Sequence, residues 1–342
     1  METPPSARLN SLSLAANIPV AITIELTRRC RLSCRHCYLP ETRGRAPACP
    51  ELGTGTWIKI LGSLARAGGL YLVFTGGEPL LRPDLPELCA AAAGLGFSVR
   101  VFSSGLGMTR RLAGGLAEAG LHGFEISFYG RPPLHDAVTG RRGSFYGSLA
   151  AARLLRAAGV AVKMKVPLMN DNIGQAGWLG SLAAREGCAI AFDPVITAAN
   201  DGARAALKYR LDPAGLRRAL RLRPRPQVTP EDPAVGEDPL CGAGRNVCSV
   251  GPDGTLYPCL QLPAPLGNLA RGSFSRIWKT SVWLKKWRSL RASDAAVCAA
   301  CADRGYCSRC PGVSMLEEGD VLAPNAPACL MARELRRLRV AP

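Results

Sequence analysis

The order of apolar and polar positions predicts alternating strands and helices. From residue 19 to residue 194, short β-branched or apolar runs alternate with stretches of helical periodicity that end at glycine-containing turns. Strands are expected at residues 20–26, 70–75, 98–103, 123–128, 161–166 and 189–193, and helices at 56–67, 83–94, 109–119, 144–158 and 174–185. Successive βα units form a partial (β/α)6 barrel or a doubly wound sheet, which the pattern alone does not distinguish.

The pattern fails near Leu222. Proline then recurs closely from Pro224 to Pro239, as in a linker, and eight cysteines follow among short, turn-rich elements. We expect a lead-in at residues 1–18, an α/β core at 19–205, a linker at 206–238, a Cys-rich domain at 239–335 and a basic tail at 336–342. Within the Cys-rich domain, residues 272–290 predict an amphipathic helix that packs its tryptophans on the domain.

Length and cysteine content narrow the class of protein. A chain of 342 residues corresponds to about two domains and can bury a core without metal or disulfide support. Fourteen cysteines are too few for a secreted disulfide scaffold and too many for ordinary core thiols, so metal or redox chemistry is expected. The chain has no apolar run long enough for a membrane span, and Arg8 is the only basic residue of a candidate signal peptide. A cytoplasmic location is therefore expected.

The charge balance predicts an anionic partner. Lys plus Arg number 43 against 26 Asp plus Glu, a net charge of +17. The basic residues are scattered and are not interleaved with aromatic residues, which argues against nucleic acid. An acidic peptide, an anionic small molecule and plain solubility remain as explanations.

Three cysteines follow the first predicted strand within one short loop. Cys30, Cys34 and Cys37 are separated by three residues and then two. Three thiolates are one fewer than a structural zinc or a fully ligated [4Fe-4S] cluster requires, so one coordination position would stay open for a substrate. The alternative is a zinc loop whose fourth ligand is His36 or a distant side chain.

A second motif ends the second predicted strand and consists of Gly76, Gly77, Glu78 and Pro79. Paired glycines let backbone groups approach a ligand closely, and a neighbouring carboxylate can accept a hydrogen bond from an ammonium group. The carboxyl ends of parallel strands are where α/β proteins bind ligands. We therefore expect this motif and the cysteine loop to form one site.

Together these two motifs resemble the signature of the radical S-adenosylmethionine (radical SAM) superfamily, which implies the partial (β/α)6 barrel. The resemblance implies that Cys30, Cys34 and Cys37 hold a [4Fe-4S] cluster whose remaining iron chelates S-adenosylmethionine. It implies that Glu78 meets the methionine amino group and that His36 lies near the adenine. It further suggests cofactor-side positions, which are Ser103, Ser104, Gly105 and Ser127.

The later cysteines resemble the SPASM extension of radical SAM enzymes, which binds two further [4Fe-4S] clusters. The resemblance assigns one cluster to Cys298, Cys301, Cys307 and Cys329, and the other to Cys241, Cys259 and Cys310 with Cys248 as a candidate fourth ligand. Three clusters per chain are thus expected. The chain departs from the usual pattern because only two residues, rather than three, separate Cys307 from Cys310. A zinc ribbon is the alternative for the compact cysteine run.

Other candidate residues match no motif. Cys89 and Cys188 are expected in the core and Cys49 in an exposed loop, while His122 and His135 are interpreted as surface or strand-end residues. Lys165 and Asp193 stand at strand ends facing the expected site and are candidate substrate contacts.

The resemblance implies an enzyme that reductively cleaves S-adenosylmethionine to a 5′-deoxyadenosyl radical, which takes a hydrogen atom from a peptide and so installs a post-translational modification. An electron donor of the flavodoxin or ferredoxin type is implied. No peptide-recognition segment is recognisable before residue 20, so a separate leader-binding protein or the barrel mouth is expected to bind a leader. One alternative is an enzyme acting on a tetrapyrrole or other small molecule, and another is a zinc-stabilised nucleic-acid-binding module.

Overall fold

The computed structural model describes residues 5–39, 50–222 and 238–340. Its centre is a parallel sheet of six strands, each joined to the next by helical connections. The strands are β1 (Ala21–Thr27), β2 (Tyr71–Gly76), β3 (Ser98–Ser103), β4 (Gly123–Ser127), β5 (Val162–Pro167) and β6 (Ala189–Asp193). Each lies within one residue of the range expected from the sequence.

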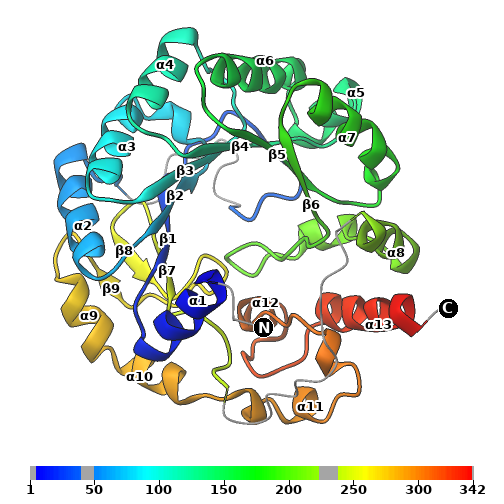
Figure 1. Cartoon of the computed structure of the whole chain (residues 1–342). Coiled ribbons are helices and arrows are strands. Elements are labelled where there is room, and N and C mark those ends of the chain that lie inside the picture. The colour runs from blue at the N-terminus through cyan, green and yellow to red at the C-terminus, as the bar shows by residue number, and fades with distance from the viewer. Residues whose placement is uncertain (1–4, 40–49, 223–237, 341–342) are drawn as a thin grey trace.

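The strand order identifies the architecture. Strands β1 to β6 are neighbours in chain order and every pair is parallel. A doubly wound sheet reverses its strand order at one point, whereas a barrel does not. The expected partial (β/α)6 barrel is therefore confirmed, and Figure 1 shows the strands following an arc with helices around its outside.

The outer helices are amphipathic. Helix α2 (Thr54–Arg66) buries Trp57, Ile60, Leu61 and Leu64, the spacing of a single helix face. The other outer helices are α3 (Leu85–Gly94), α4 (Arg110–Glu118), α6 (Ser144–Ala157) and α7 (Ala176–Arg185). The core fills the space between these helices and the sheet.

Three helices between residues 5 and 222 were not expected. Helix α1 (Pro5–Ala16) lies in the lead-in and buries only Ser13, so no apolar stripe signals it. Helix α5 (Pro132–Thr139) starts at a proline and is capped by Gly140, whose φ of 68° lies in the left-handed region. Helix α8 (Pro213–Arg221) begins after Asp212, whose carboxylate accepts from the Gly215 amide at 2.7 Å. Helix α8 occupies part of the expected linker, whose residues 223–237 lie outside the described part.

The C-terminal segment extends the same sheet. Strand β7 (Val247–Val250) pairs in parallel with β1, and β8 (Thr255–Tyr257) and β9 (Gly267–Asn268) follow antiparallel. Figure 1 shows this segment across the open side of the arc. The expected helix at 272–290 is two helices, α9 (Phe274–Thr280) and α10 (Val282–Ser289), because Ser281 between them has a ψ of 120°, outside the helical region.

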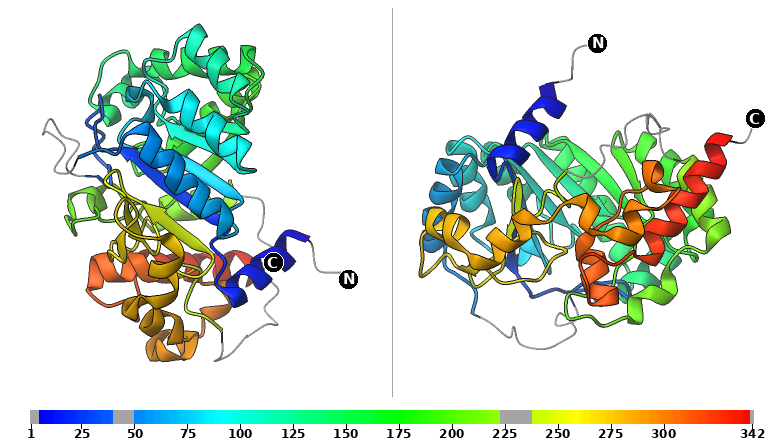
Figure 2. Two further views of the ribbon diagram at one scale, coloured as in Figure 1. Left: turned by 90° about the vertical axis from the view of Figure 1, so that its left-hand side faces the viewer. Right: turned by 90° about the horizontal axis from the view of Figure 1, so that it is seen from below.

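Three more helices and five 3-10 turns remain among the described residues. They are α11 (Ala296–Ala299), α12 (Pro311–Glu318), α13 (Ala326–Val340) and the 3-10 turns η2 (Pro79–Leu81), η3 (Ile173–Gln175), η4 (Ala205–Tyr209), η5 (Ala292–Asp294) and η6 (Arg304–Tyr306). Figure 2 shows α1 projecting from the body of the molecule. Among the described helices, not one combines the length and the apolar character needed to cross a membrane.

Candidate active site

The cysteine loop opens onto a cavity of about 460 Å³ at the carboxyl ends of the strands. Cys30, Cys34 and Cys37 all line this cavity. Helix α5 holds the middle of the loop, since the Ser33 amide donates to the Thr139 carbonyl at 2.9 Å and the Arg35 amide donates to that of Val138 at 3.1 Å. Three thiols on one wall fit a cluster with one open coordination position.

The paired glycines pack against the stem of the cysteine loop. Gly76 has a φ of +127°, and a Cβ there would lie 2.3 Å from the Thr27 carbonyl oxygen. A Cβ on Gly77 would lie 2.3 Å from the Arg29 carbonyl oxygen. Both glycines line the cavity. They are required even without a ligand, because a side chain at either position would collide with the backbone of the stem.

Glu78 is fully buried behind the cavity. Its carboxylate accepts from the Ser103 hydroxyl at 2.6 Å, the Leu80 amide at 3.1 Å and the Ser104 amide at 2.9 Å, and also from the Ser104 hydroxyl. Burial raises the pKa of Glu78, and these donors offset the rise only in part. Glu78 and Pro79 are not among the cavity-lining residues, whereas Ser104 is.

An aromatic wall faces the thiols. The rings of His36 and His135 lie 5.0 and 5.3 Å from that of Tyr129, centroid to centroid, and all three residues line the cavity with Ser127. Burial lowers the pKa of each histidine to about 4, so both imidazoles are neutral at pH 7. A neutral ring at His36 fits the expected contact with adenine.

The interpretation of His135 as a surface or strand-end residue was wrong. His135 lies on α5 with 1% of its surface exposed. Its position was missed because α5 itself was not expected. The proline at the start of α5 and the glycine after it were the available signal.

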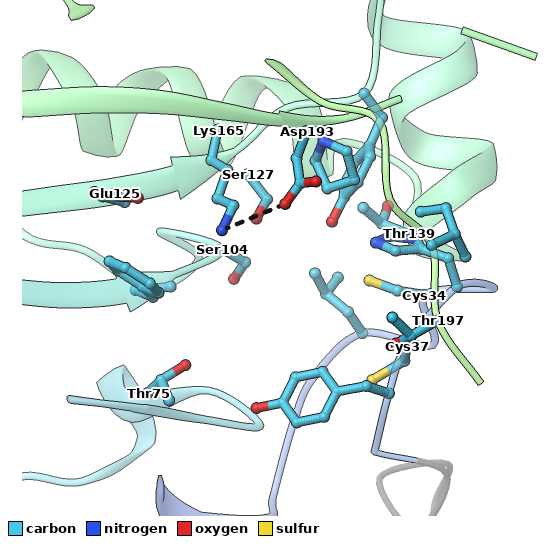
Figure 3. A pocket seen from close by; sticks show the side chains of 18 of the residues that line it. Cys34, Cys37, Thr75, Ser104, Glu125, Ser127, Thr139, Lys165, Asp193 and Thr197 are labelled. Carbon is cyan, nitrogen blue, oxygen red and sulfur yellow. Dashed lines mark ion pairs between the residues drawn. The ribbon is translucent and has the colours of Figure 1, made fainter. Parts of the chain in front are cut away.

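Charged side chains line the far wall (Figure 3). Lys165 on β5 and Asp193 at the end of β6 point toward each other, with Nζ and Oδ2 3.9 Å apart. Both side chains remain partly exposed, at 36% and 40%, so they stay candidate substrate contacts. Glu125 also lines the cavity, but its carboxylate is engaged by Lys163 at 3.1 Å.

The C-terminal segment closes one side of the cavity. Gln261, Cys310 and Val313 line it together with the three loop cysteines. A Cβ on Gly312 would lie 2.3 Å from the Gln261 carbonyl oxygen, so α12 begins in direct contact with the Gln261 loop. Cys310 thereby brings the second cysteine-rich region to the wall of the first site.

The remaining cysteines separate into two groups. Cys298, Cys301, Cys307 and Cys329 line a second cavity of about 490 Å³. Besides burial, Cys259 and Cys310 raise the pKa of the Cys241 thiol and Cys310 raises that of Cys259, so these three residues lie close together. The first set offers four thiols, the number that a fully ligated four-iron cluster takes, and the second offers three, with Cys248 as the candidate fourth. Across the described ranges, no three His, Cys, Asp or Glu side chains converge on a single metal ion.

Cys248 occupies a different environment. It lies on β7 opposite Ile22 of β1, with none of its surface exposed, within the hydrophobic core. Burial, and then the nearby Cys259, raise the pKa of its thiol. Cys89 and Cys188 are buried, as expected, and Cys49 lies outside the described residues.

Comparisons with known proteins agree with this geometry. The family model of the Radical SAM superfamily matches residues 24–174, and that of an iron-sulfur cluster-binding (SPASM) domain matches residues 241–311. A PqqA peptide cyclase of Streptomyces rochei is 32% identical over 340 residues, covering 92% of this chain and 90% of the relative. An AdoMet-dependent heme synthase of Oleidesulfovibrio alaskensis is 27% identical over 341 residues, which cover 90% of this chain and 86% of the relative.

Solved structures share the fold. Streptococcus suis SuiB bound to its precursor peptide SuiA superposes with a TM-score of 0.72 at 16% identity, covering 96% of this chain and 82% of that one. The enzyme anSMEcpe with bound AdoMet and the Cp18Cys peptide gives a TM-score of 0.68 at 16% identity, covering 93% of this chain and 96% of that one.

Proposed function

Because this chain belongs to the radical SAM superfamily and carries a SPASM domain, we propose that it is a maturase that abstracts a hydrogen atom from a peptide to install a modification. The observation that supports this most is the shared cavity. Three thiols, the glycine pair, strand-end serines and a cysteine of the SPASM domain all line it.

Within this proposal, Cys30, Cys34 and Cys37 hold the first cluster. When bound, the cluster and S-adenosylmethionine supply the reductive cleavage that yields methionine and a 5′-deoxyadenosyl radical. The protein's part is binding, orientation and exclusion of water. Neutral His36 packs beside the adenine, Ser104 and Ser127 present hydroxyls, and Gly76, Gly77, Glu78 and Pro79 form the methionine side of the site.

Two auxiliary clusters complete the proposal. Cys298, Cys301, Cys307 and Cys329 would hold one, and Cys241, Cys259 and Cys310 the other. Cys248 is the candidate fourth ligand of the second set, and its proximity to Cys259 supports that role. We expect about twelve iron atoms per chain after anaerobic reconstitution, and about eight when Cys298→Ala and Cys307→Ala are combined. A count near four in the unmodified protein would contradict both auxiliary clusters.

The proposed substrate is an acidic peptide. The PqqA peptide cyclase is named for a peptide substrate, and SuiB and anSMEcpe have been solved with bound peptides. A net charge of +17 suits an acidic precursor. A flavodoxin- or ferredoxin-type donor would supply the electron, and either a separate protein or the cavity mouth itself would bind a leader.

The alternative is a tetrapyrrole or other small molecule, which the heme synthase relative supports. The deciding experiment incubates the reconstituted enzyme with S-adenosylmethionine, a reductant and either acidic peptides encoded beside its gene or a tetrapyrrole carboxylate. We expect 5′-deoxyadenosine and a change of peptide mass. Turnover of the tetrapyrrole with no change in any peptide would favour the alternative.

A further inference from the structure

The stem of the cysteine loop, residues 27–29, is held on two sides. On one side lies the loop that follows β2, where the Gly77 amide donates to the Thr27 carbonyl at 2.7 Å. The Glu78 amide donates to the Arg29 carbonyl at 2.8 Å. The stem therefore lies against the predicted S-adenosylmethionine loop immediately before Cys30.

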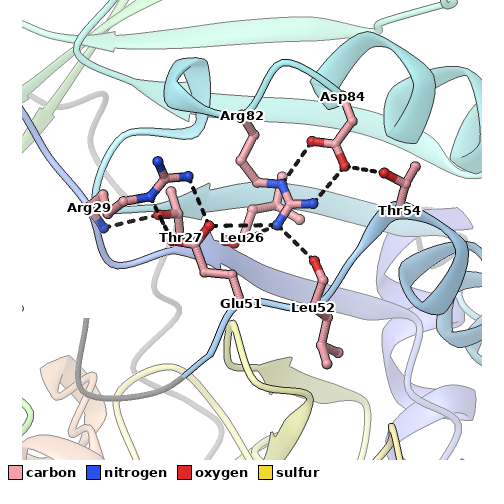
Figure 4. Close-up of polar contacts among 8 residues, drawn as sticks. All are labelled: Leu26, Thr27, Arg29, Glu51, Leu52, Thr54, Arg82 and Asp84. Atoms are coloured by element: carbon pink, nitrogen blue, oxygen red, sulfur yellow. Dashed lines mark hydrogen bonds and ion pairs between the residues drawn. The ribbon is translucent and has the colours of Figure 1, made fainter. Parts of the chain in front are cut away.

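On the other side lies Glu51 (Figure 4). Its carboxylate accepts hydrogen bonds from both Nε and Nη2 of Arg29 at 2.9 Å and one from the Thr27 hydroxyl. A contact through two hydrogen bonds fixes the orientation of the guanidinium relative to the carboxylate as well as the distance between them. Glu51 thus holds the side chains of the same two stem residues whose carbonyls contact the glycine loop.

Arg82 connects this arrangement to the rest of the barrel. It follows η2 and has only 7% of its surface exposed. Its guanidinium donates to the Leu52 carbonyl at 2.9 Å and to the Leu26 carbonyl at 3.4 Å, and it contacts both oxygens of Asp84 at 2.9 and 2.6 Å. Its distance to the Glu51 carboxylate is 3.8 Å.

Both carboxylates of the network are ionised at neutral pH. Burial alone would raise the pKa of Glu51, but hydrogen bonds from Arg29 and Thr27 outweigh it and lower the pKa. Asp84 behaves in the same way through Arg82 and Thr54. The contacts are therefore charge-assisted, the stronger class of hydrogen bond.

We propose that Glu51 and Arg82 form a clamp that positions Cys30 for the first cluster. Helix α5 holds the loop near Cys34 independently, through Ser33 and Arg35. Loosening the clamp would therefore move Cys30 relative to the other two thiols without unfolding the barrel. Glu51 and Arg82 act through the stem and are positioning residues. This inference rests on the proposed role of the three cysteines.

The test compares Glu51→Gln with Glu186→Gln. Glu186 makes an equivalent two-point contact with Arg153, at 2.8 and 2.7 Å, between α6 and the end of α7, and it is the matched control. Each reconstituted protein is challenged with an iron chelator. Loss of the first cluster is followed by the paramagnetic resonance signal that responds to S-adenosylmethionine, and loss of the other clusters by the remaining signal and by iron content.

We expect Glu51→Gln to lose the responsive cluster at least about tenfold faster than the unmodified protein, with the other clusters and Glu186→Gln unchanged. Arg29→Gln, a partly exposed position, should show the same selective loss to a smaller extent. Equal loss rates in the Glu51 variant and the unmodified protein would overturn the clamp, as would faster loss from all clusters together. An unmodified protein without any responsive cluster would instead contradict the proposed function.

Discussion

At the scale of single residues, Glu78 is a buried carboxylate whose hydrogen-bond donors are all neutral. Ser103, Ser104 and the Leu80 amide satisfy its oxygens without neutralising its charge. Burial accordingly raises its pKa. A cationic ligand beside it would relieve this cost, which supports the proposed contact between Glu78 and the methionine ammonium group.

Replacing Glu78 by alanine should weaken S-adenosylmethionine binding. A charge-assisted hydrogen bond is worth about 1.5 to 3 kcal/mol, or about tenfold to a hundredfold in affinity, whereas Glu78 ligates no iron in this scheme. Equilibrium binding and the visible absorption of the cluster measure the two effects separately. Ser103→Ala, which keeps the charge, should have a smaller effect. Unchanged affinity in Glu78→Ala would indicate that residues 76–79 form only a turn and do not contact S-adenosylmethionine.

His135 should make the protein sensitive to acid. Burial lowers its pKa to about 4 from an ordinary value of about 6.5, so the unfolded chain binds the proton more readily. Above about pH 6.5 protonation of His135 therefore does not lower the free energy of unfolding. As the pH drops to about 4, this free energy falls by about 3 kcal/mol.

The measurement compares denaturant midpoints of His135→Phe and the unmodified protein across this pH range. Whatever the substitution costs at pH 7, the difference in stability should move in favour of the variant by about 3 kcal/mol by pH 4. His122→Phe is the matched control, since His122 is exposed. A difference that stays constant with pH would show that His135 does not titrate in this way.

At the scale of elements, the cysteine loop is held by the turn after β2, by the segment of Glu51 and by the C-terminal end of α5. The turn was predictable because Gly76 and Gly77 sit next to a strong strand pattern. The α5 contact was not, since it joins Ser33 to Thr139 across more than a hundred residues. Cysteine spacing is local and readable in one dimension, whereas such pairing depends on the completed fold.

Gly77→Ala should disrupt the stem of the cysteine loop. The added Cβ would lie 2.3 Å from the Arg29 carbonyl oxygen, a backbone atom that cannot rotate away. We expect the first cluster to be lost and the auxiliary clusters to remain, as measured by iron content and by the S-adenosylmethionine-responsive signal. Gly94→Ala is the control, because nothing lies within 4 Å of its added Cβ. Full retention of the first cluster in Gly77→Ala would contradict this account.

At the scale of the whole molecule, one sheet joins the barrel to the SPASM region. The Cys-rich domain was expected to be organised by metal, and its strand β7 also pairs with β1. The sequence pattern could not reveal this pairing, because a short strand carries no signal of its partner. Cys248 consequently belongs to the core of the combined sheet as well as to the neighbourhood of Cys259.

The net charge of +17 predicts salt-sensitive association with an acidic peptide. The Debye length falls from about 10 Å at 0.1 M salt to about 3 Å at 1 M, so exposed charges lose their reach. Binding titrations at increasing salt should show peptide affinity falling steeply and S-adenosylmethionine affinity nearly constant. Salt-independent binding of a tetrapyrrole, with no peptide binding at low salt, would oppose the peptide proposal.

The pairing of β1 with β7 also affects how the chain is made. The ribosome adds about 220 residues between Thr27 and Val247, which takes roughly 10 to 45 s at typical rates of synthesis. Throughout this interval one edge of β1 has no partner, and unpaired strand edges promote aggregation. The nascent polypeptide is therefore most vulnerable to aggregation between the synthesis of β1 and the synthesis of β7.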